Sequence, residues 1–132
     1  MTTTSAGNSV RELMSSPVLT IELTDSLWDA WQLLSVSGLR HLIVLGRNGE
    51  CLGIINDRQI LAQAPATTER LGCITVNDFL GQASTTTLNP DDTPQHAAAL
   101  MREQGIEALP VCTAEGKIAG ILTQTDLIRW IS

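Results

Sequence analysis

The sequence predicts a mixed α/β fold of the α+β type, built from two β-α-β-β-α repeats. Three glycines of the first half recur 67 residues later, and the apolar positions between them recur at the same spacing. The glycine pairs are Gly38 and Gly105, Gly49 and Gly116, and Gly53 and Gly120. A repeat of this kind indicates the architecture more firmly than any single local propensity. With 132 residues, 43% of them hydrophobic, the chain is long enough to bury one good core.

The repeats divide the chain into four parts. We expect residues 1–9 to form a disordered tail, 10–64 the first repeat, 65–75 a connector and 76–132 the second repeat. The connector, "PATTERLGCIT", contains Pro, Gly and Thr without clear periodicity. Neither repeat is expected to be stable alone, because about 60 residues bury too little surface.

Each repeat should begin with a short helical turn, "VRELM" or "VNDFL", followed by a strand at 18–22 or 85–88. Thr24-Asp25 and Asp91-Asp92 can supply N-cap oxygens to the long helix that follows.

The long helices should end at glycine C-caps, Gly38 and Gly105. Two strands should follow, joined by tight hairpins at "RNGE" (47–50) and "AEGK" (114–117), and then a closing helix.

Composition and charge exclude several classes of protein. The net charge of −6, without a block of like charges, argues against a general nucleic-acid binder and against a basic membrane-surface helix. No apolar run approaches the roughly 20 residues that cross a bilayer, and the first residues lack the features of a signal peptide. We therefore expect a soluble, cytoplasmic protein.

Catalytic and metal-site motifs are missing from the sequence. Cys51, Cys112, His41 and His96 lack the spacing of zinc ligands, and three cysteines without a C-x-x-C pair do not predict a disulfide framework. None of the common hydrolase, nucleotide-loop or dinucleotide motifs occurs. The sequence therefore predicts neither an enzyme nor a metal site.

The closing segment "GILTQTDL" (120–127) has a twin in "GIINDRQI" (53–60). Thr123-x-x-Asp126 and Asn56-x-x-Gln59 can both form a capping box, but only the second copy adds a carboxylate. A carboxylate can accept hydrogen bonds from both hydroxyls of a cis-diol, and a helix start attracts phosphate. The residues alone leave open whether Asp126 caps the helix, binds a ligand or does both.

The opening pattern V-x-x-h-M/L and the closing pattern G-h-h-T/N-x-x-D/Q, where h is apolar, resemble a tandem pair of cystathionine-β-synthase-type (CBS) domains, the Bateman module. The resemblance covers Val10 to Ile131. It implies two repeats packed with pseudo-twofold symmetry around two clefts that often bind AMP, ADP, ATP or S-adenosylmethionine. It also implies a regulatory, non-catalytic module without a required cofactor, which acts on an effector protein encoded elsewhere.

By this resemblance, each cleft is built from the closing motif of one repeat and the segment after the long helix of the other. The Asp and Thr of the motif hold ribose or phosphate in relatives, which assigns these roles to Asp126 and Thr123. The better cleft would contain Thr123, Asp126, Ile121, Val18, Leu39, Arg40 and His41. The weaker cleft would contain Asn56, Gln59, Thr85, Glu107 and Ala108.

The charges of the two predicted clefts differ in the same direction as their closing motifs. Arg40 and His41 can meet a phosphate, whereas Glu107 would repel it. Ordinary core packing of Val18 and Ile121 and a purely structural role for Arg40 and His41 remain alternatives.

Trp28 and Trp31 lie three residues apart on the first long helix, so both can contact one surface. The resemblance implies pairing through these helices into a homodimer, whereas filling the core is the alternative role. The alternative function for the whole chain is a ligand-free protein-interaction or dimerisation module with degenerate clefts.

Overall fold

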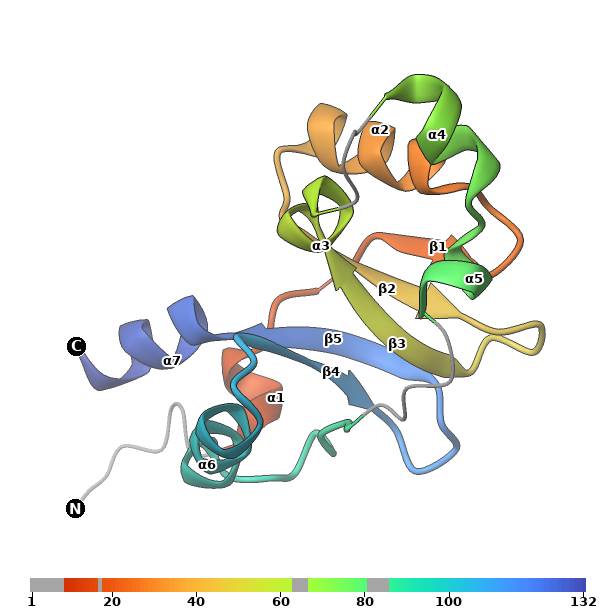
Figure 1. Ribbon diagram of the computed structural model, residues 1–132. Coiled ribbons are helices and arrows are strands. Elements are labelled where there is room, and N and C mark those ends of the chain that lie inside the picture. Colours follow the sequence, from red (N-terminus) through yellow and green to blue (C-terminus); the bar gives the residue numbers. More distant parts are fainter. Residues whose placement is uncertain (1–8, 17, 63–66, 81–85) are drawn as a thin grey trace, which may run out of the picture. The chain divides into compact units, whose positions relative to one another are not determined.

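The structure is a computed structural model that describes residues 9–16, 18–62, 67–80 and 86–132 (Figure 1). The chain forms two compact units. Unit 1 combines Met1–Val18 with Thr86–Ser132, and unit 2 comprises Leu19–Thr85. The predicted tail at 1–9 lies outside the described residues except for Ser9.

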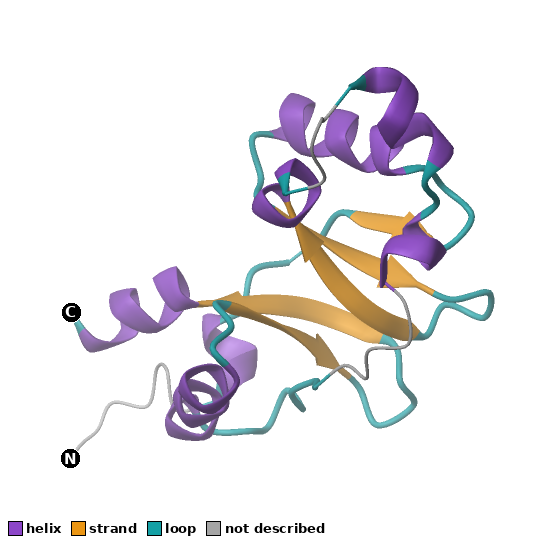
Figure 2. Ribbon diagram, in the orientation of Figure 1, coloured by secondary structure: helices purple, strands orange, loops and turns teal. Residues whose placement is uncertain are grey.

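Unit 2 contains a three-stranded sheet in the order β1-β2-β3, with β1 parallel to β2 and β2 antiparallel to β3 (Figure 2). Its elements are β1 (Thr20–Glu22), α2 (Leu27–Ser37), β2 (His41–Leu45), β3 (Cys51–Asn56), α3 (Asp57–Leu61), α4 (Thr68–Cys73) and α5 (Val76–Leu80). Alternation along the sheet buries Leu42, Val44 and Ile55 in a core with Leu27 and Leu34 of α2.

Unit 1 contains a two-stranded antiparallel sheet and repeats the same plan around a second core. Its elements are α1 (Val10–Leu13), α6 (Pro94–Gln104), β4 (Ala108–Cys112), β5 (Ile118–Thr123) and α7 (Gln124–Ile131). The predicted strand at 85–88 is wrong for its described residues, 86–88, because only Leu88 makes a ladder contact, a parallel bridge to Val111. The mixed helix and strand content confirms the predicted fold class.

The opening helix of each repeat packs in the unit formed by the other repeat. Helix α1, from the first repeat, contacts β5 and α7, and the Val10 N–H donates to the Asp92 carbonyl over 2.8 Å. Helix α5, from the second repeat, contacts α2, and the Val76 N–H donates to the Asp25 carbonyl over 2.8 Å. Each compact unit therefore depends on residues from both sequence repeats.

The helix caps follow the predicted plan with one shift. The predicted N-caps are wrong by one or two positions, because Ser26 and Thr93 cap α2 and α6. The Asp25 and Asp92 carboxylates instead accept from the N–H groups three residues earlier and close the turns before the helices.

Positive φ values mark the predicted glycine turns. Gly38 and Gly105 end the long helices at φ 74° and 65°, which confirms the predicted C-caps. Gly49 and Gly116 adopt φ 81° and 83° in the two hairpin loops. A two-residue Asn-Gly turn would need a positive φ at both Asn48 and Gly49. Asn48 does not have one, because the described non-glycine residues all have negative φ. The Gly46 N–H bonds to the Glu50 carbonyl, so the loop is longer than a two-residue Asn-Gly turn.

The predicted connector contains regular structure. Within 65–75, residues 68–73 form helix α4, which packs against α2 and buries Leu71 (Figure 1). Thr67 caps this helix by accepting from the Arg70 N–H over 3.1 Å. A single helical turn and a half is too short to show periodicity, which explains why the sequence did not reveal it.

Candidate functional site

The closing motifs lie where a strand passes directly into a helix. Strand β5 ends at Thr123 and α7 follows, and strand β3 ends at Asn56 and α3 follows. In the sheets Thr123 pairs with Ala108, and Asn56 pairs with His41. The two motifs therefore occupy equivalent positions in their units.

Both motifs form complete capping boxes, as the sequence predicts. In unit 1 the Thr123 N–H donates to Asp126 Oδ2 over 2.9 Å, and the Asp126 N–H donates to Thr123 Oγ1 over 3.4 Å. In unit 2 the Asn56 N–H donates to Gln59 Oε1 over 2.9 Å, and the Gln59 N–H donates to Asn56 Oδ1 over 2.8 Å. An amide closes the box as well as a carboxylate does, so capping alone does not require the charge of Asp126.

Asp126 is the one charged residue that is buried among those the structure describes, with 6% of its surface exposed. Its Oδ2 also accepts a hydrogen bond from the Thr123 hydroxyl over 3.2 Å. Its Oδ1 lies 3.9 Å from Nη1 of Arg129 and accepts no hydrogen bond from a described residue. A buried carboxylate is costly unless it is paired, so this half-satisfied group is an unusual feature of the unit.

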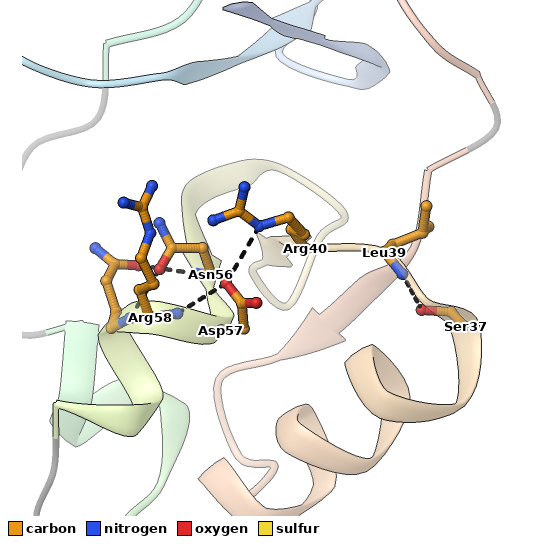
Figure 3. A network of polar contacts seen from close by, with 7 residues as sticks. Ser37, Leu39, Arg40, Asn56, Asp57 and Arg58 are labelled. Atoms are coloured by element: carbon orange, nitrogen blue, oxygen red, sulfur yellow. Dashed lines mark hydrogen bonds and ion pairs between the residues drawn. The ribbon is translucent and has the colours of Figure 1, made fainter. Parts of the chain in front are cut away.

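Arg40 belongs to a polar network at the start of α3 (Figure 3). Its Nε lies 3.7 Å from Oδ1 of Asp57, and the same oxygen accepts the Arg58 N–H over 2.8 Å. Figure 3 shows the side chains of Arg40 and Arg58 extending to the same side of the β3–α3 junction. Asp57 is not among the predicted site residues, although a carboxylate in the first turn of a helix is a recognisable signal.

The backbone part of this network is repeated in unit 1 with different side chains. The Asp57 N–H donates to the Arg40 carbonyl over 3.2 Å, and the Gln124 N–H donates to the Glu107 carbonyl over 2.9 Å. Glu107 and Gln124 replace the arginine and the aspartate 67 residues earlier. The two units therefore share the geometry and differ in the ionic groups beside it.

The predicted site residues that the structure describes have neighbours within their own unit. Across β4 and β5 it brings Thr123 beside Ala108, and across β2 and β3 it brings Asn56 beside His41. Leu39 is exposed, and its N–H bonds to Ser37 Oγ over 3.1 Å. Thr85 lies outside the described residues, and the predicted grouping of residues from both repeats stays a prediction.

The residues before Thr123 are bound to the segment that follows α1. Ser15 forms an antiparallel bridge with Ile121, with N–O distances of 2.9 and 3.1 Å. Ile121 and Val18 are half-buried, so neither is simply a core residue of unit 1. A segment from the first repeat therefore borders the closing motif of the second.

The tryptophans have a role within the chain. Trp28 and Trp31 are half-buried and pack against the core of unit 2, which is the alternative that the sequence left open.

The described residues include no group of three metal-ligating side chains. In the same part of the chain, no helix has the length and apolar character needed to span a bilayer.

A family model for the CBS domain matches residues 10–65 and 74–132. A CBS domain-containing protein of Dictyostelium discoideum is 28% identical over 90% of this chain and 88% of its own length. A homoserine O-acetyltransferase of Methanococcoides burtonii is 30% identical over 93% of this chain, which spans only 24% of that enzyme.

Solved structures of CBS domain pairs have the same fold. The CBS domain pair of the protein MJ0100, solved in complex with 5′-methylthioadenosine and S-adenosylmethionine, is 26% identical, with a TM-score of 0.73 over 93% of this chain and 94% of that one. The protein CBSX2, solved in complex with AMP, is 26% identical, with a TM-score of 0.77 over 93% and 95% of the two chains. This chain belongs to the CBS domain family and carries two CBS domains in tandem.

Proposed function

We propose that this tandem pair is a non-catalytic regulatory module that binds an adenosine-containing ligand through Thr123 and Asp126. The observation that carries the proposal is the buried carboxylate of Asp126, which has acceptor capacity beyond what the helix cap uses. The ligands of MJ0100 and CBSX2, both of them CBS proteins, support an adenosyl group as the common element. No cofactor is part of the proposal.

The hydrogen bonds of Asp126 define how a ribose can bind. A carboxylate offers about four acceptor positions, and Oδ2 uses two of them for the N–H and the hydroxyl of Thr123. The remaining two positions are on Oδ1, which is therefore the atom that would receive the ribose hydroxyls. Gln59 offers only its amide oxygen, which already accepts the Asn56 N–H, so the motif of the first repeat is the poorer acceptor.

The other predicted residues complete the proposal. Arg40 and His41 would meet a phosphate, and Val18, Ile121 and Leu39 would supply apolar contacts to the base. A phosphate would compete with Asp57 for the Arg40 guanidinium, which is exposed and held at 3.7 Å. The weaker site would use Asn56, Gln59, Thr85, Glu107 and Ala108.

Ligand binding should raise the thermal stability of the protein. At about 100 times the dissociation constant, a ligand adds roughly 2.7 kcal/mol to the free energy of unfolding. We expect a melting-temperature increase with at least one of AMP, ADP, ATP and S-adenosylmethionine. Asp126→Asn keeps an oxygen for the Thr123 N–H but removes the charge, so it should weaken binding by about tenfold to a hundredfold.

Asp29→Asn is the matched control for Asp126→Asn. Asp29 occupies the same position in the capping box of α2, where its Oδ2 accepts the Ser26 N–H over 3.3 Å. Asp29→Asn should leave the ligand-induced shift intact. Gln59→Ala should also leave most of that shift. If no ligand raises the melting temperature, the proposed function is wrong.

Exposed apolar side chains on α7 favour assembly as a second function. Ile128 and Ile131 are 59% and 72% exposed, and they lie three residues apart on one side of the helix. We propose that the chain forms a homodimer through this surface. We also propose that an effector protein in the cytoplasm recognises the dimer. Cys51, Cys73 and Cys112 form no disulfide with one another, which is consistent with such a reducing location.

The double variant Ile128→Glu with Ile131→Glu should convert the dimer into a monomer, measured by sedimentation velocity. The variant places two charges where an interface would have to desolvate them. Glu115→Lys in the exposed hairpin loop of unit 1 is a control for altered surface charge and should keep the dimer. A wild-type chain that sediments as a monomer at all concentrations would rule out this second function.

A further inference from the structure

We infer that Arg129 is a competitor for the ligand site: it is the counter-ion of Asp126 in the ligand-free protein, and a ribose must displace it. The inference rests on the proposed function, because it concerns the same carboxylate. It assigns to Arg129 a role in setting affinity, separate from the roles of the residues that contact the ligand.

The geometry of the ion pair carries the inference. Nη1 of Arg129 lies 3.9 Å from Oδ1 of Asp126, one helical turn along α7. This distance is too long for a hydrogen bond, so the guanidinium offsets the charge of the carboxylate without a directional contact that would hold it in place. The Arg129 side chain is 76% exposed, whereas Asp126 is buried. The arginine can therefore swing into solvent at little cost while the carboxylate stays in place.

Competition follows from the position of the free acceptor sites. The Thr123 N–H and hydroxyl occupy Oδ2, so a diol has only Oδ1 to bind. A hydroxyl must come within about 3 Å of Oδ1 to form a hydrogen bond. The Arg129 guanidinium already borders this atom, so a bound diol and the ion pair use the same oxygen of the carboxylate.

The first repeat supplies an internal comparison. The residues 67 positions before Asp126 and Arg129 are Gln59 and Ala62. Both charges are absent there, although the capping box and the helix start are retained. The arginine therefore accompanies the carboxylate, which is expected if its role is to balance that charge.

Arg129→Gln should bind adenosine about two to five times more tightly than the wild type at low ionic strength, measured by isothermal titration calorimetry. The factor corresponds to the usual contribution of one solvent-exposed ion pair. Adenosine is the probe because it carries the ribose without a phosphate, so salt does not act on the ligand. Arg129→Lys keeps the charge and should bind like the wild type.

Salt dependence separates competition from a structural role of the arginine. The Debye length falls from about 30 Å at 0.01 M salt to about 3 Å at 1 M, which weakens the ion pair. Wild-type affinity for adenosine should therefore rise with salt towards that of Arg129→Gln, whose own affinity should stay constant. Arg102→Gln, which removes an exposed arginine from the last turn of α6, should follow the wild type.

The outcomes distinguish the inference from the proposed function. If Asp126→Asn abolishes adenosine binding but Arg129→Gln binds with unchanged or weaker affinity, the proposed site stands and the competition is wrong. If neither adenosine nor any of the nucleotides binds to the wild type or to Arg129→Gln, both are wrong.

Discussion

Gly120→Ala should lower the free energy of unfolding by about 1–3 kcal/mol, the usual cost of adding a methyl group to a filled space. A Cβ at this position would lie 2.7 Å from Sδ of Met14 and 2.8 Å from the Ser15 carbonyl oxygen. The thioether can rotate away, but the carbonyl is backbone and accepts the Ile121 N–H over 3.1 Å. Urea unfolding should show a lower midpoint with an unchanged m-value.

Gly72→Ala is the matched control for this substitution. Gly72 is exposed within α4, and a Cβ there would meet no atom within 4 Å. Alanine is about 0.5–1 kcal/mol more favourable than glycine inside a helix, so this variant should be more stable than the wild type. Equal effects of the two variants would show that the segment after α1 does not cross β5 closely.

Much of the fold was predictable because the repeat aligns residues that have the same physical task. Gly38 and Gly105 end helices with positive φ, a conformation that residues with side chains rarely adopt. The repeat spacing therefore predicted both the positions of these two glycines and their role as C-caps. The N-caps were less predictable, because three neighbouring polar residues precede each long helix and only the third of them, Ser26 or Thr93, caps it.

The candidate site was predictable where it depends on local geometry. A Thr or Asn followed three residues later by Asp or Gln predicts a capping box, and both boxes form. The ion pairs were missed for different reasons. Asp57 meets Arg40 only because β2 and β3 are paired, whereas Arg129 and Asp126 are one turn apart and were visible in the sequence.

The packing of the opening helices could not be predicted from the repeat. The repeat assigns "VRELM" to the first half of the chain. The apolar pattern shows which residues of this helix are buried, but it does not show in which core they are buried. In the structure Val10 lies in the core of unit 1 with Leu109 and Leu122. The boundaries of the compact units therefore differ from the boundaries of the sequence repeats.

Val10→Ala should destabilise the protein by about 2 kcal/mol, even though Val10 lies in a four-residue helix near the N-terminus. The side chain is fully buried, and the substitution removes two methyl groups, each contributing about 0.8 kcal/mol, and leaves a cavity. Denaturant unfolding measures the loss. Amide hydrogen exchange should quicken in β4 and β5, because Val10 packs against residues of these strands.

Val36→Ala is the control, because it removes the same two methyl groups from a side chain that is 88% exposed on α2. Its effect should stay within about 0.5 kcal/mol, the range for surface substitutions. The difference in stability between the two variants tests whether α1, which belongs to the first repeat, packs in unit 1. A valine in a frayed N-terminal segment would behave like Val36, whereas a valine that fills the core of unit 1 must cost several times more. Equal stability of the two variants would therefore show that α1 is not part of unit 1, and that the second repeat completes its core without residues from the first.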